Sequence, residues 1–146
     1  MGDQATLQSY EHRIFTRLAE SDLYRTYQDA FRNATGLPLR LVAVDEQWCL
    51  PEHLDNQSPF CEKLNLCDTA CQACITTNRR LMEEAKIKGP VSCGCFSGMS
   101  ATAVPVKLGS SPVAFLKTGQ VFQRTPEEAD FQRVLGTLRE NNFVPD

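Results

Sequence analysis

Four cysteines constrain the fold of this chain of 146 residues more than any other feature. They are Cys61, the C-x-x-C pair Cys71 and Cys74, and Cys95. A C-x-x-C at the start of a helix points both sulfur atoms to one side, so a fold that also brings in the other two can hold one ion or cluster. If the four share a site, Cys61 and Cys95 must lie at the first turn of the helix that carries the pair.

The spacing leaves three interpretations of these cysteines open. Four thiolates suit Zn²⁺ or an iron–sulfur cluster, and the spacing does not decide between the two cofactors. A redox switch is the second interpretation, with the C-x-x-C as the first pair to form a disulfide. In the third, the cysteines are small buried core residues, a common role of free Cys. Our metal-site prediction comprises Cys61, Cys71, Cys74 and Cys95.

The composition and the N-terminal sequence limit the cellular compartments and the classes of binding partner that we expect. The N-terminus lacks the apolar run of a secretory signal, which predicts a cytoplasmic location, where clustered cysteines more often bind metal or sense redox state than form structural disulfides. No apolar stretch approaches the roughly 18 residues of a membrane span. The net charge of −3 and the scattered Lys and Arg argue against direct nucleic-acid binding.

The hydrophobic pattern predicts an α+β domain with a mainly antiparallel sheet and helices packed on one face. Strands do not alternate with helices, so a parallel doubly wound sheet is not expected. The expected helices cover about 8–34 (with a new cap at 21–22), a short segment from 59, 70–88 and 125–140; the expected strands cover 39–44, 91–96, 101–108 and 112–122.

Local signals set several of these boundaries. Gly36 is placed as a helix C-cap, and either Asp68 or Thr69 as the cap of the long central helix. Thr125 and the proline after it predict the start of the last helix. Pro105, inside an otherwise regular strand, predicts an edge position or a bulge.

Six short motifs follow one another along most of the chain: ATGLPL (34–39), PFC (59–61), CQAC (71–74), CFSGM (95–99), AVPV (103–106) and KTGQV (117–121). Together and in this order, they resemble the PocR-type sensory domain over roughly residues 23–138. The resemblance implies a PAS-like variant fold that senses a ligand, as found in AraC-type transcriptional regulators and sensor kinases. The family's Cys-His-Ala-Gly-Leu segment is altered here, because Phe96 replaces the histidine.

We expect residues 1–22 to form an N-terminal helical segment and residues 23–146 to form the sensor domain, with no output domain in this chain. With only two histidines, a Ser-His-Asp or Cys-His catalytic set has little support, so no enzyme activity is expected. The predicted function is signal sensing in a bacterial transcriptional regulator or signalling protein. The alternative is a cysteine-based metal or redox sensor, and the helical N-terminus would suit a homodimer.

A small organic ligand is the expected partner, in an apolar pocket with few polar anchors. Aromatic residues flank the expected pocket between helix and sheet. Gln120 is an amide inside an apolar strand, and a buried amide must bond either to backbone or to a ligand. The predicted ligand-binding residues are Trp48, Phe60, Phe96, Phe115 and Gln120.

Overall fold

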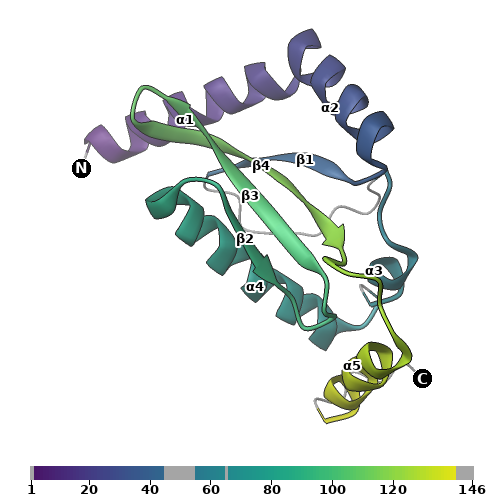
Figure 1. Ribbon diagram of the computed structural model, residues 1–146. Helices are drawn as coiled ribbons and strands as arrows, with labels where there is room; N and C mark the ends of the chain where they lie inside the picture. The colour runs from purple at the N-terminus through teal and green to yellow at the C-terminus, as the bar shows by residue number, and fades with distance from the viewer. Residues whose placement is uncertain (1, 45–54, 65, 141–146) are drawn as a thin grey trace.

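The computed structural model describes residues 2–44, 55–64 and 66–140, which form five helices and one four-stranded sheet (Figure 1). This arrangement confirms the α+β class and the predicted order of elements. The helices are α1 (Gly2–Ala19), α2 (Asp22–Thr35), α3 (Pro59–Leu64), α4 (Asp68–Lys88) and α5 (Glu128–Glu140); the strands are β1 (Leu39–Ala43), β2 (Val91–Gly94), β3 (Ser100–Leu108) and β4 (Ser111–Val121).

The sheet has the order β1-β4-β3-β2, and every neighbouring pair is antiparallel. β3 and β4 form the predicted hairpin, with Gly109 in the left-handed region (φ 66°) at the turn. The pairing of β2 with β3 ends at Ala103, so Pro105 lies where β3 pairs with β4 alone. A register shift comes next, between Val106 and Lys107, which confirms the expected irregularity.

Helix α4 covers one face of this sheet. Its residues Leu81 and Met82 pack with Val42 of β1 and Phe115 of β4, and Phe115 is fully buried. Val42 and Phe115 are directly paired in the register. This contact forms the larger hydrophobic core of the described residues and fixes α4 against the sheet.

The first two helices cover the sheet where α4 does not. Leu41 and Val42 of β1, and Ala114 and Phe115 of β4, are consecutive buried residues. Since side chains alternate between faces along a strand, both faces of these two strands are covered. Helices α1 and α2 contact β1, and α1 also contacts β4. Helix α4 is therefore the helix expected on one face of the sheet, and α1 and α2 form an additional layer on the other face.

Two helix starts differ from the sequence expectation. Helix α4 begins at Asp68 with Cys67 as its N-cap, one or two residues earlier than expected. Helix α5 begins at Glu128 rather than at 125–126. There, the Asp130 carboxylate accepts a hydrogen bond from the backbone N–H of Glu127 (2.8 Å), so it satisfies a free donor at this helix start.

Two glycines provide a matched test of this packing. A Cβ on Gly119 of β4 would lie 2.9 Å from Ala101 Cα on β3, whereas a Cβ on Gly136 of α5 would meet nothing within 4 Å. We expect Gly119→Ala to destabilise the domain by about 1–3 kcal/mol through backbone displacement. Gly136→Ala should stabilise it by about 0.5–1 kcal/mol through helix propensity. Urea unfolding of both variants measures the difference, and equal effects would contradict the β3–β4 approach.

Candidate functional site

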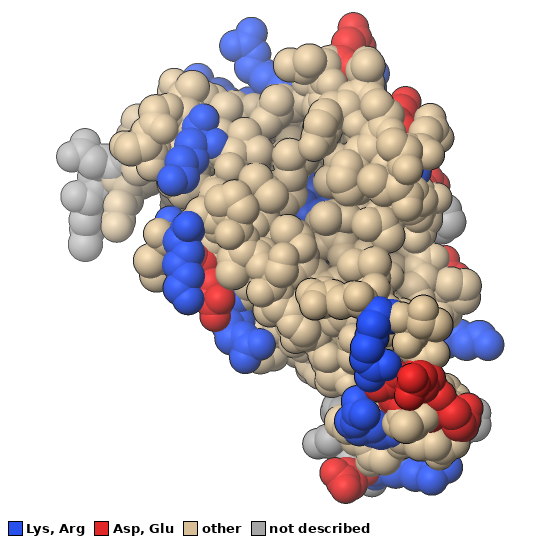
Figure 2. Space-filling view, viewed as in Figure 1, with Lys and Arg blue, Asp and Glu red and all other residues tan. Residues whose placement is uncertain are grey.

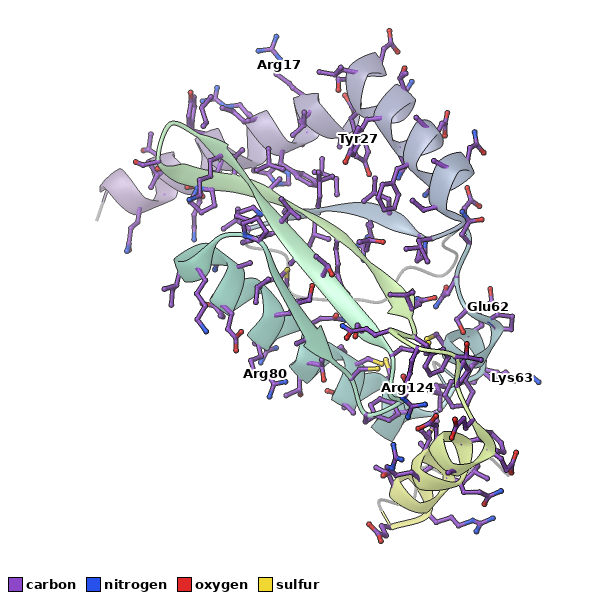
Figure 3. The ribbon with its side chains drawn as sticks, viewed as in Figure 1. Arg17, Tyr27, Glu62, Lys63, Arg80 and Arg124 are labelled. Carbon is purple, nitrogen blue, oxygen red and sulfur yellow. The ribbon has the colours of Figure 1, made fainter. Side chains whose placement is uncertain are left out.

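The four predicted cysteines come from three separate parts of the fold. Cys61 lies on α3, Cys71 and Cys74 lie near the start of α4, and Cys95 comes directly after β2. All four are partly buried free thiols. Figure 3 shows sulfur atoms gathered where the N-terminal end of α4 meets the sheet. The fold therefore brings α3, the start of α4 and the end of β2 near one another.

Burial and the nearby thiols raise the pKa values of two of these cysteines. Burial raises the pKa of Cys61 to about 11, with further contributions from the charges of Cys95 and Cys74. Burial also raises the pKa of Cys74 to about 11, and here Cys95 and Cys71 add to the shift. The Cys95 Sγ lies 2.6 Å from the Ser97 Oγ, which makes a hydrogen bond between the two side chains. At neutral pH, Cys61 and Cys74 are therefore uncharged thiols.

By ligand type, the four thiols are suitable for Zn²⁺ or an iron–sulfur cluster, because both are bound by soft sulfur donors. Across residues 2–44, 55–64 and 66–140, however, no three or more Cys, His, Asp or Glu side chains are arranged to hold a metal ion. Metal ligation also requires deprotonated sulfur, so binding would have to release protons from high-pKa thiols. The metal site at Cys61, Cys71, Cys74 and Cys95 stays a prediction.

Two basic residues lie beside the thiols. Arg40 on β1 is paired directly with Lys117 on β4. The pKa of Lys117 falls to about 8, first because of burial and then because of the Arg40 charge; the Cys74, Cys93 and Cys61 thiols oppose this shift. Sequence reasoning missed this pair. The only available signal was a basic residue within each of two apolar strands, and their pairing depends on the register.

A cavity of about 610 Å³ lies between the segment after β2 and helix α5. The aromatic rings of Phe96 and Phe122 form part of its wall, and Arg124 and Arg133 contribute positive charge. Figure 2 shows basic and acidic side chains interspersed at the α5 end of the molecule, whereas the surface over the sheet is mostly uncharged. This cavity therefore combines apolar rings with cationic groups at its rim.

A second cavity of about 430 Å³ lies beside the segment that joins β4 to α5. Phe60, Met99 and Phe131 line it, so it is the more apolar of the two. The two cavities share four wall residues, which are Phe122, Pro126, Asp130 and Val134.

Helix α5 forms a wall of both cavities and is held by two kinds of contact. Val134 and Leu138 pack with Leu64 of α3 and Ala70 of α4 in a second, smaller core. Arg124, which Figure 3 labels near the start of α5, donates from Nη1 to Asp130 at 2.8 Å. This hydrogen bond with Arg124 lowers the pKa of Asp130 to about 2. The ion pair was not predicted, although its two residues are close in sequence and Asp130 lies in the first turn of α5.

The predicted ligand residues have different positions in the structure. Phe60 lines the smaller cavity and Phe96 the larger one. Phe115 is a fully buried core residue beneath α4, away from both cavities. The Gln120 side-chain carbonyl accepts a hydrogen bond from the Ser58 backbone N–H, so this amide joins β4 to the start of α3. Trp48 lies outside the described residues.

The raised pKa values predict slow thiol chemistry at two positions. At pH 8, a thiol of pKa about 11 is ionised about a hundredfold less than one at the ordinary value of 9.0. We expect iodoacetamide to alkylate Cys61 and Cys74 about a hundredfold more slowly in the folded protein than in urea. Residue-resolved mass spectrometry measures both rates. Alkylation at the unfolded rate in the native protein would contradict the buried, coupled arrangement.

The family comparison agrees with this architecture. A family model described as the sensory domain found in PocR matches residues 17–142, which is most of the chain. Searches of curated proteins and of solved structures found no match. No described helix is both long and apolar enough to cross a membrane. The chain therefore belongs to the family of PocR sensory domains.

Proposed function

We propose that this chain is a non-enzymatic sensing domain that binds a small organic molecule in the two cavities beside α5. The observation that carries the proposal is the family match over residues 17–142, because the family is defined as sensory. The resemblance to regulators supports a host that is a bacterial transcriptional regulator or signalling protein in the cytoplasm. In such a host the domain would sense the ligand and leave DNA contact to another part.

The cavities have the properties of a small-molecule site. Volumes of about 610 and 430 Å³ fall in the range of ligand pockets, roughly 300–1,000 Å³. Phe60, Phe96 and Phe122 offer apolar surface, and Arg124 with Asp130 offers a small number of polar anchors. An apolar wall with few oriented polar groups favours a small organic molecule over an inorganic ion.

Helix α5 is the element best placed to report occupancy. It walls both cavities, and only two of its described residues, Val134 and Leu138, are buried. A ligand shifts a conformational equilibrium only by its difference in affinity between the two states. A molecule that contacts Phe122 and Val134 together would therefore stabilise the docked position of α5 relative to an undocked one. Pairing of two copies through the N-terminal helices would be compatible with this mechanism.

A thermal-shift screen of small alcohols, diols and carboxylates tests this proposal. We expect at least one class to stabilise the protein, by about 2.7 kcal/mol at 100 times its Kd. Phe122→Ala should weaken that ligand about tenfold, since the 40% exposed ring lines both cavities without belonging to the core.

Ile87→Ala is the matched control, because Ile87 is 86% exposed near the far end of α4. It should leave ligand affinity unchanged. If no compound shifts unfolding, or if Phe122→Ala and Ile87→Ala behave alike, the cavities beside α5 are not the ligand site.

The second candidate is a metal or redox sensor in which the thiols are the receptor. It is favoured by one observation, that Cys61, Cys71, Cys74 and Cys95 converge from three elements and interact electrostatically. Zinc would give a colourless, air-stable protein, and an iron–sulfur cluster would give a brown protein that bleaches in air.

Elemental analysis of anaerobically prepared protein decides between the candidates. If the thiols are a metal site, about one zinc or one cluster should be present per chain, and Cys61→Ser and Cys95→Ser should lose it. Cys93→Ser, which changes a thiol on β2 outside the predicted set, should retain the metal. Metal-free protein with equal stability of the three variants would exclude this candidate.

A further inference from the structure

Two basic side chains lie side by side on the face of the sheet that α4 covers. Arg40 of β1 and Lys117 of β4 are directly opposite each other in the antiparallel register. Val42 and Phe115, two positions further along the same strands, belong to the core beneath α4. Because side chains alternate along a strand, Arg40 and Lys117 point to the α4 side as well. Like charges directly opposite on neighbouring strands repel each other, so this pairing has a cost within the sheet.

The groups around Lys117 come from every neighbouring element. Besides Arg40 on β1, these are the thiols Cys61 on α3, Cys74 on α4 and Cys93 on β2, and the paired residue on β3 is Ala103. The pKa values of Cys61 and Cys74, about 11, leave these two thiols without negative charge at neutral pH. Arg40 and Lys117 also have other interactions within the chain. A bound anion would be an additional partner for both residues.

We infer that Arg40 and Lys117 form a binding site for the carboxylate of a small organic acid. The guanidinium offers a planar fork that matches a carboxylate, and the lysine ammonium adds a point charge beside it. Thiols lie beside Lys117, and the core residues Val42 and Phe115 follow two positions along the same strands; these groups suit the organic part of such an acid. They supply few donors for the extra oxygens of a phosphate or sulfate. This site is separate from the cavities beside α5 and does not depend on their function.

Thermal unfolding at constant ionic strength tests the assignment with acetate, propionate and butyrate as probes. Propionamide and 1-propanol serve as uncharged counterparts, and sodium chloride, phosphate and sulfate as inorganic controls. We expect the carboxylates to raise Tm at pH 7 and their uncharged counterparts to leave it unchanged. Equal shifts with propionate and propionamide would overturn the assignment. Stabilisation by phosphate or sulfate alone, or by no anion at all, would overturn it as well.

Substitutions then locate the effect. Lys117→Met and Arg40→Gln should each weaken propionate about tenfold or more, because a hydrogen bond to a charged group is removed. Lys107→Met is the matched control, since Lys107 is exposed near the end of β3; it should leave propionate binding unchanged. Unchanged binding in folded Lys117→Met protein would overturn the proposal. If both variants unfold, the comparison of propionate with propionamide on the wild-type protein decides alone.

Discussion

The packing of Phe115 and Val42 against α4 is the contact on which the rest of the structure depends. It pairs β1 with β4 and holds the long helix beneath both strands. The same contact sets the start of α4, with Cys71 and Cys74, beside Cys95 after β2. It also sets Arg40 opposite Lys117, two residues from the core pair. Losing the Phe115 ring would therefore disturb the core, the thiols and the cations together.

Local chemistry could be predicted from the sequence, and long-range register could not. Ser21 caps α2 as expected, since its hydroxyl accepts from the Tyr24 N–H, and Gly36 takes the left-handed C-cap conformation. Both depend only on residues a few positions away. The pairing of Arg40 with Lys117 spans the chain and depends on strand register, which no local signal specifies. Gln120 could be recognised from the sequence as a polar residue in an apolar strand that needs a hydrogen-bond partner. The partner itself, the Ser58 backbone N–H, could not be predicted because it is distant in the sequence.

Cys95 connects the two regions to which function is assigned. It contributes to the raised pKa values of Cys61 on α3 and Cys74 on α4, and it also lines the larger cavity beside α5. The next residue along the chain, Phe96, packs against the smaller core that holds Val134 of α5. A change at the thiols would thus reach the cavity wall through one short segment. Under the proposed function, this segment would link the bound organic ligand to the chemical state of the cysteines.

In the proposed function, a ligand binds beside α5 and alters the docking of this helix. Amide chemical-shift mapping of the ¹⁵N-labelled protein, with and without a saturating ligand found by the thermal screen, locates the bound ligand. We expect the largest shift changes at Phe96, Gly98, Phe122 and Val134, with smaller changes along the rest of α5. Changes confined to α1 and α2, with the signals of α5 unmoved, would show that the ligand does not bind there.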